Sequence, residues 1–211
     1  MIYLLYRSIQ ELLPEQAISK RMTAQQRESI RDYRFHYLSR FCAQQDLPPP
    51  QLQHHTHGKP YFGNLPQLHF NHSHSQQHYA LAYSQDEIDL GVDVEDLRRQ
   101  VRMRALAEHA FHPDELSMWQ RTDYDRQFWF KVWTIKEAVL KAHGLGIRLS
   151  LNMLNTQAHP DWDFGMLQHA QLGEFYYQHY CTGQSMITLA YRKQSSDGLA
   201  NIYWCTEDSS A

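Results

Sequence analysis

The chain has 211 residues, 42% of them apolar, which is enough to bury one large core or two smaller ones. The formal net charge is −3, which argues against a broad nucleic-acid-binding surface. Three cysteines lie far apart at Cys42, Cys181 and Cys205, so we expect no disulfide framework and a reducing, cytoplasmic setting.

The N-terminal part predicts a strand, a long helix and several short strands. Residues 2–7 favour a strand, and this apolar run is too short for a signal peptide. No later stretch approaches the length of a membrane span. Residues 23–45 predict a helix with Thr23 as its N-cap, ended by the proline-rich residues 46–50. Residues 51–65 are rich in loop signals, and residues 68–71 and 78–84 predict short strands.

Polar residues that suit an anion gather around the first of these short strands. Lys59, in Gly-Lys-Pro, offers a compact positive charge, and Ser73 and His74 offer a hydroxyl and an imidazole. Seven histidines between residues 54 and 78 raise the alternative of a zinc or nickel site. Since no cysteine lies nearby and no His-Glu-x-x-His spacing occurs, most of these histidines are expected in loops and on the surface.

Residues 88–95 alternate strictly between apolar and polar side chains, which predicts a strand with two different faces. Asp93 and Glu95 project from the same face, close together. Two carboxylates at that distance raise each other's pKa unless a cation lies between them, and an all-oxygen site suits Mg²⁺. The alternative is a solvated strand face without a metal.

Residues 125–142 predict the central helix, ended by residues 143–146. One apolar stripe contains Phe128, Val132, Ile135 and Val139. The opposite stripe contains Phe130, Trp133, Glu137 and Lys141, which indicates a second face that lines a site. An exposed pair of Glu137 and Lys141, four residues apart, is the alternative. Two shorter helices are expected at residues 102–109 and 113–119, and later strands at residues 175–181, 186–192 and 201–206.

A faint repeat indicates the overall architecture. Residues 80–84 read Ala-Leu-Ala-Tyr-Ser and residues 188–192 read Thr-Leu-Ala-Tyr-Arg, each followed by a turn and another strand. We therefore expect an α+β fold of two similar halves, residues 1–87 and 88–211.

Four short motifs in this order resemble the Sfp-type 4′-phosphopantetheinyl transferases. They are Gly58–Pro60, Phe70–Ser75 (Phe-Asn-His-Ser-His-Ser), Gly91–Glu95 (Gly-Val-Asp-Val-Glu) and Trp133–Lys141 (Trp-Thr-Ile-Lys-Glu-Ala-Val-Leu-Lys). The resemblance covers roughly residues 20 to 155. The chain departs from the family at His72, where an apolar residue is usual, and in the short segment between Arg31 and Arg40.

The resemblance implies a pseudo-twofold monomer, with coenzyme A bound between an N-terminal half that contacts its phosphates and a C-terminal half that carries the metal site and the catalytic helix. It implies a cytoplasmic enzyme that transfers 4′-phosphopantetheine from coenzyme A to a serine of an apo acyl, polyketide or peptidyl carrier protein, releasing 3′,5′-ADP. The implied magnesium ligands are Asp93, Glu95 and Glu137. The implied catalytic residues are Glu137, as the base unless a metal-bound water takes that role, and Lys141, at the leaving phosphate. The implied coenzyme A contacts are Arg40, Lys59, Pro60, Asn71, Ser73, His74 and Lys141, with Arg31 and Arg34 as helpers.

Two other functions stay open at this stage. A non-catalytic coenzyme A or nucleotide-binding module could keep the same fold, although all three carboxylates and Lys141 are present. A Mg²⁺-dependent phosphohydrolase could use a similar carboxylate cluster, but it offers no reason for the Phe70–Ser75 motif. Arg98, Arg99, Arg102 and Arg104 form a basic cluster that suits an acidic carrier protein or is simply a solvated helix face.

Overall fold

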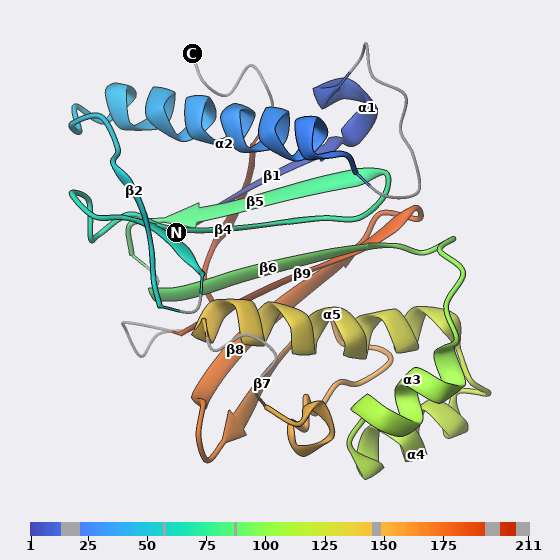
Figure 1. Cartoon of the computed structure of the whole chain (residues 1–211). Helices are drawn as coiled ribbons and strands as arrows, with labels where there is room; N and C mark the ends of the chain where they lie inside the picture. The colour runs from blue at the N-terminus through green and yellow to red at the C-terminus, as the bar shows by residue number, and fades with distance from the viewer. Residues whose placement is uncertain (14–21, 57, 87, 145–148, 193–198, 206–211) are drawn as a thin grey trace.

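The computed structural model describes residues 1–13, 22–56, 58–86, 88–144, 149–192 and 199–205 (Figure 1). The described helices are α1 (Ile9–Leu12), α2 (Ala24–Gln44), α3 (Met103–Ala110), α4 (Pro113–Arg121) and α5 (Arg126–His143), with a short 3₁₀ turn at Leu151–Met153. The described strands are β1 (Ile2–Ser8), β2 (Leu52–His54), β3 (Pro60–Phe62), β4 (His69–His74), β5 (His78–Ser84), β6 (Ile88–Asp96), β7 (Phe164–His169), β8 (Gly173–Cys181), β9 (Ser185–Arg192) and β10 (Ile202–Cys205).

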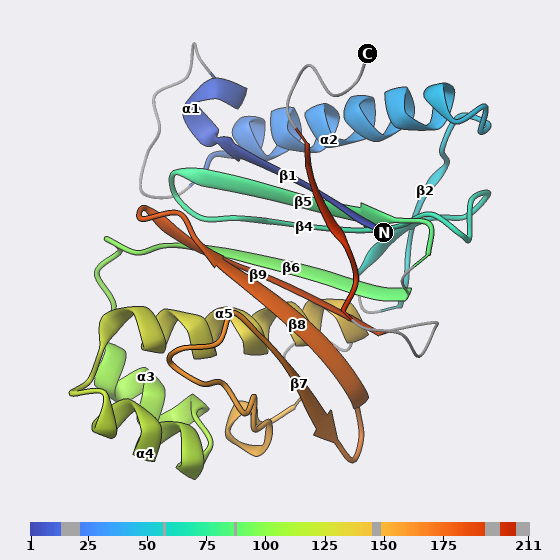
Figure 2. The ribbon, with the colours of Figure 1, turned by 180° about the vertical axis from the view of Figure 1, so that it is seen from behind.

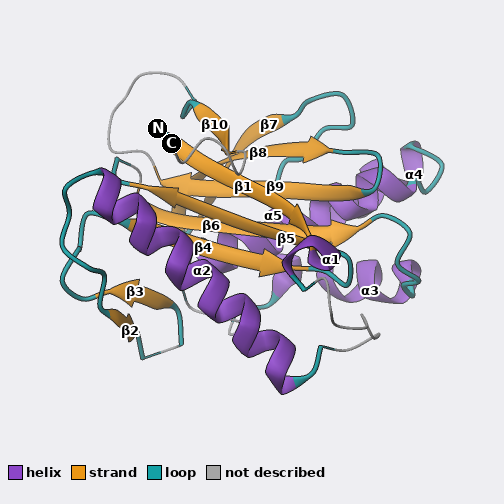
Figure 3. Cartoon of the chain, turned by 90° about the horizontal axis from the view of Figure 1, so that it is seen from above, coloured by secondary structure: helices purple, strands orange, loops and turns teal. Residues whose placement is uncertain are grey.

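Two four-stranded sheets lie between two long helices. The first sheet has the order β10-β1-β5-β4 and the second the order β6-β9-β8-β7. Helix α2 covers the outer face of the first sheet and α5 that of the second, as both side views show (Figures 1 and 2). Seen from above, α2 crosses the strands obliquely, while α3 and α4 lie together at one end of the molecule (Figure 3).

The alternation of β5 explains how the first sheet fills both of its faces. Tyr79, Leu81 and Tyr83 belong to the core beneath α2. Ala80 and Ala82 belong to the separate core between the sheets. Successive strand residues point to opposite faces, so bulky side chains meet the helix and small ones let the second sheet approach.

The same chain order builds both sheets. In the first, β1 is followed by α2 and then by the antiparallel strands β4 and β5, with β5 next to β1. In the second, β6 is followed by α5 and then by the antiparallel strands β8 and β9, with β9 next to β6. Strand β10 departs from the repeat, because it leaves the second half and pairs in parallel with β1. The α+β class expected from the sequence is confirmed.

Most of the expected elements are present, with three differences. The segment 51–65, expected as loop, contains the β2–β3 hairpin, and neither α1 nor β7 was expected. Within the described ranges, no helix is long and apolar enough to cross a membrane.

Candidate active site

A row of small polar side chains, on β4 and at the residue after it, joins the two sheets where β4 and β6 lie next to each other. The backbone amide of Val92 donates to Oδ1 of Asn71 at 2.9 Å. The Ser73 hydroxyl donates to Oδ1 of Asp93 at 2.9 Å. The Ser75 hydroxyl donates to Oδ1 of Asp96 at 2.6 Å. Since Asn71, Ser73 and Ser75, which directly follows β4, are spaced two apart, their side chains lie on one side of this segment. The motif predicted to bind phosphate therefore also joins the two halves.

Asp93 lies at the centre of this junction. Besides Ser73, the Lys141 ammonium donates to its Oδ1 at 2.6 Å, and it also donates to the Ser73 hydroxyl at 2.7 Å. Oδ2 of Asp93 is sealed from solvent and has no hydrogen-bond partner among the described residues. A buried carboxylate oxygen without a partner is costly, so this atom marks a position where a cation or donor would be stabilised.

Gly91 allows α5 to reach this junction. A Cβ atom at position 91 would lie 2.1 Å from the carbonyl oxygen of Ala138 and 2.5 Å from the amide nitrogen of Ala142. No side chain fits in that space, so the helix rests directly on β6. This close packing brings the last turns of α5, which carry Glu137 and Lys141, beside Asp93.

Asp93, Glu95 and Glu137 are hereafter called the carboxylate cluster, because the charge of Asp93 acts on both glutamates. Burial, and next the Asp93 charge, raises the pKa of Glu95 to about 7. The same two causes raise the pKa of Glu137. Arg99 lies 2.9 Å from Oε2 of Glu95 and offsets part of the repulsion. The two sequence blocks whose meeting could not be shown from the sequence alone therefore do meet.

Of the three lysines on α5, only Lys141 points to the carboxylate cluster. Lys131 donates to three backbone carbonyls, including that of His159 at 3.0 Å. Lys136 is fully buried and lies 2.8 Å from Glu115. These two lysines hold the loop after the helix and helix α4 in place. The prediction that the second face of α5 lines a site is wrong at Phe130. This side chain is fully buried, because the core surrounds this part of the helix.

The carboxylate cluster has the donor set for a hard divalent cation, but its side chains are not gathered around a single point. Across the described ranges, no group of three or more His, Cys, Asp or Glu side chains is arranged to hold a metal ion. Two of the three carboxylates are paired with basic side chains: Asp93 with Lys141 and Glu95 with Arg99.

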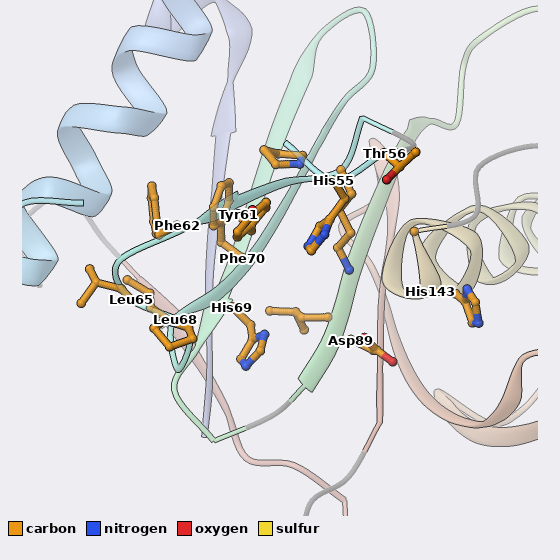
Figure 4. Close-up of a pocket in the computed structure, with 15 residues that line it drawn as sticks. His55, Thr56, Tyr61, Phe62, Leu65, Leu68, His69, Phe70, Asp89 and His143 are labelled. Atoms are coloured by element: carbon orange, nitrogen blue, oxygen red, sulfur yellow. The ribbon is translucent and has the colours of Figure 1, made fainter. Parts of the chain in front are cut away.

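Lys59 and Pro60 lie in a separate pocket of about 610 Å³ between the β2–β3 hairpin and the C-terminal end of α5 (Figure 4). The Lys59 ammonium donates to the carbonyl of Ala142 in the last turn of α5. Burial lowers the pKa of this ammonium to about 8. The structure therefore places Lys59 as a partner of a helix C-terminus and not beside Ser73.

His74 lines another pocket, of about 470 Å³, between β4 and the start of α2. This arginine pocket is formed by Ala24, Arg27, Glu28, Ile30, Arg31, Arg34, His72 and His74. Its acid, Glu28, is paired with Arg31 at 2.9 Å, so the pocket keeps an excess of positive charge. The sequence reasoning missed Arg27, although its spacing of four and seven residues from Arg31 and Arg34 places all three on one helical face.

Arg40 lies elsewhere. It lines a third pocket, of about 620 Å³, with several tyrosines that include Tyr37 and Tyr83. The structure does not bring Arg40 together with His74 or with the carboxylate cluster. Its predicted phosphate contact stays a prediction.

Comparison with known proteins gives this arrangement a family. Residues 89–192 match the model of the 4′-phosphopantetheinyl transferase superfamily, a segment that includes the carboxylate cluster and Lys141. Over this segment the chain is similar to this superfamily. The resemblance expected from the four motifs is confirmed, including the Sfp-type group.

Three curated relatives show how far this similarity extends. It is 31% identical to 4′-phosphopantetheinyl transferase Sfp of Bacillus subtilis (strain 168) over 107 residues, which are 50% of this chain and 46% of Sfp. It is 37% identical to 4′-phosphopantetheinyl transferase AcpT of Escherichia coli (strain K12) over 100 residues, 46% of this chain and 50% of AcpT. It is 28% identical to 4′-phosphopantetheinyl transferase psf-1 of Bacillus pumilus over 165 residues, 74% of this chain and 69% of psf-1. The matched part of the chain thus spans about half the length of Sfp and AcpT.

The superfamily match begins at residue 89, so Lys59, Ser73, His74 and the arginine pocket lie outside it. The connection of these upstream residues to the carboxylate cluster rests on geometry. Ser73 provides it, because its hydroxyl bonds both Asp93 and Lys141.

Proposed function

We propose that this chain transfers 4′-phosphopantetheine from coenzyme A to a serine of an apo carrier protein and releases 3′,5′-ADP. The observation that carries the proposal is the convergence of Asp93, Glu137 and Lys141 at the junction of the two sheets. The superfamily match includes these residues, and relatives bear the name 4′-phosphopantetheinyl transferase.

The carboxylate cluster would hold a magnesium ion. Two observations support this fit: Oδ2 of Asp93 is buried without a partner among the described residues, and burial and the charge of Asp93 raise the pKa of Glu95 and Glu137. A cation removes both costs, and Mg²⁺ prefers carboxylate oxygens and phosphate co-ligands. When bound, it polarises the reacting phosphorus and neutralises charge on the leaving group.

Glu137 is the proposed general base. A serine hydroxyl is a poor nucleophile until a base takes its proton, and the raised pKa of Glu137 makes this carboxylate a better proton acceptor. Lys141, one turn further along α5, stabilises the negative charge of the leaving phosphate. Both of its present partners, Ser73 and Asp93, belong to the site, so this ammonium is already in position.

The 3′-phosphate of coenzyme A would bind in the arginine pocket, next to His74. Guanidinium groups pair well with phosphate oxygens, and three of them line this pocket. Asn71 and Ser73 position β4 against β6, which sets the distance between the phosphate end and the carboxylate cluster. The proposal also includes contacts to coenzyme A from Lys59, Pro60 and Arg40. The contact from Arg40 has the least support, because this residue lines the third pocket, away from His74 and the carboxylate cluster.

The rest of the proposal concerns organisation and partners. The chain would act in the cytoplasm as a monomer of two halves, residues 1–87 and 88–211, with β10 returning to the first sheet. Arg98 and Arg102 are exposed just after β6, where an acidic carrier protein would dock near the carboxylate cluster. Arg99 of the same basic cluster is held by Glu95 and contributes less.

One assay tests the activity. The protein is incubated with coenzyme A, Mg²⁺ and an apo carrier domain, and the intact mass of the carrier is measured. A gain of one phosphopantetheine group is the expected result. Binding of coenzyme A without any gain on several carriers supports the non-catalytic module instead. Cleavage of coenzyme A in the absence of a carrier supports a phosphohydrolase.

A further inference from the structure

His72 faces the arginine pocket, although this position of the Phe70–Ser75 motif is usually apolar in the resembling family. It lies two residues before His74 on β4, so both imidazoles project from the same face of the strand, toward α2. The His72 side chain is half-buried. Its Nδ1 atom is sealed from solvent and has no hydrogen-bond partner in the described part of the chain. An imidazole on the wall of a cationic pocket can donate a hydrogen bond to an anion through a protonated ring nitrogen.

Charged and titratable groups on four elements lie near this ring. The charges of Arg34 on α2, Lys141 on α5 and His74 on β4 itself act on it. Tyr79 of β5 lies with its ring centroid 6.0 Å away. Burial, and then the charges of Arg34, Lys141 and His74, hold the pKa of His72 well below its usual range. The ring is therefore neutral at physiological pH while no anion is present.

We propose that His72 is a specificity-determining residue that binds the phosphate in the arginine pocket and takes up a proton when a phosphate dianion enters. This inference rests on the proposed function, since the phosphate is taken to be the 3′-phosphate of coenzyme A. The dianion offsets the positive charges that, after burial, hold the ring neutral, and a negative charge beside the imidazole favours its charged form. The charged ring then donates a hydrogen bond to a phosphate oxygen, and such a charge-assisted bond is stronger than a neutral one.

Proton uptake makes the discrimination between ligands depend on pH. If one proton enters with the phosphate, affinity for the phosphorylated ligand rises by up to about tenfold for each unit by which the pH falls. A ligand without the 3′-phosphate gives the ring no such partner. The preference for the 3′-phosphate should therefore grow toward acidic pH in the native protein.

The test uses 3′,5′-ADP and 5′-AMP as probes, which differ only in the 3′-phosphate and need neither Mg²⁺ nor a carrier. Calorimetric titrations at pH 7.5, in buffers of different ionisation enthalpy, measure the protons taken up on binding. His72→Gln keeps a side chain that can donate a hydrogen bond but cannot titrate. His72→Phe removes both properties. His36→Gln is the matched control, because His36 is an exposed histidine on α2 that does not line the arginine pocket.

We expect the native protein and His36→Gln to take up protons with 3′,5′-ADP but not with 5′-AMP. His72→Gln should lose most of this uptake while it retains a preference for 3′,5′-ADP at pH 8. His72→Phe should lose both the uptake and about tenfold in affinity for 3′,5′-ADP at pH 6.5. Circular dichroism checks the fold, and His72→Gln alone decides the question if His72→Phe does not fold.

Two failures have different meanings. Equal proton uptake by His72→Gln and the native protein would overturn the role of His72 and leave the proposed coenzyme A site standing. A native protein that binds 3′,5′-ADP no better than 5′-AMP would overturn both the proposed phosphate site and the inference built on it.

Discussion

The substitution Glu95→Gln should stabilise the ligand-free protein at neutral pH, although it removes an ion pair. The side chain of Glu95 is 11% exposed, and burial together with Asp93 raises its pKa from 4.5 to about 7. Because the folded state holds this proton to a higher pH than the unfolded chain, it binds more protons between pH 4.5 and 7. Stability contributed by this site therefore falls across that interval, and the loss is complete above pH 7.

The size of the effect follows from the same displacement of the pKa. It corresponds to about 3 kcal/mol between the two protonation states, with the partial compensation by Arg99 already included. Glutamine resembles protonated glutamate in size and hydrogen bonding. The variant should therefore match the native protein near pH 4.5 and exceed its free energy of unfolding by about 3 kcal/mol above pH 7.

Urea unfolding in the presence of EDTA, repeated from pH 5 to pH 8, measures this difference. Glu108→Gln is the matched control, because Glu108 forms an ion pair with Arg104 four residues away but its side chain is 61% exposed. Its difference from the native protein should stay within about 0.5 kcal/mol at every pH. A Glu95→Gln difference that does not change with pH would refute the electrostatic account of the carboxylate cluster.

The remaining predictions concern the proposed reaction. Asp93→Ala should lower transfer by about 100-fold or more at saturating Mg²⁺ in the carrier-mass assay; near-normal turnover would eliminate the proposed metal site. His74→Ala and Lys59→Ala should weaken binding of coenzyme A more than that of dephospho-coenzyme A, by about 1.5–3 kcal/mol for a charge-assisted bond; equal losses for both ligands would mean that these residues contact something else. Glu137→Gln should depress turnover far more than coenzyme A binding and flatten the acidic limb of the rate–pH profile, whereas Lys141→Ala should affect binding and rate together. An acidic limb unchanged in Glu137→Gln would assign the base to a metal-bound water.

The carboxylate cluster could be predicted because its signals are local. The alternation of residues 88–95 put Asp93 and Glu95 on one strand face, and the helical period put Glu137 and Lys141 on one side of α5. Gly91, which interrupts the polar face of β6, is what allows these two elements to touch. The motif order added the information that they belong to one site.

Other parts depended on long-range packing that no local pattern encodes. Strand β10 pairs with β1, which is about 200 residues earlier in the sequence. The sequence alone therefore could not show that β10 belongs to the first sheet. Strand β7 lies at the edge of its sheet and exposes Phe164 and Met166, so it lacks the clean alternation of a half-buried strand. Lys59 was predicted at the phosphate because lysine suits anions, and this contact stays a prediction. In the structure its ammonium donates to the carbonyl of Ala142, since a helix C-terminus attracts the same charge.

The three lysines of α5 show why a motif match alone does not identify a functional side chain. Lys131 and Lys136 are both buried, and each is held by backbone carbonyls from the segment after the helix. Removing either would leave buried polar groups of the scaffold without partners, which destabilises the fold whatever the chemistry. Lys141 is instead 30% exposed, and its hydrogen bonds go to Ser73 and Asp93. An ammonium whose partners are an anionic ligand site and a β4 hydroxyl can exchange them for a phosphate at little structural cost. Position on the helix is therefore what separates Lys141, with its proposed catalytic role, from the scaffolding lysines Lys131 and Lys136.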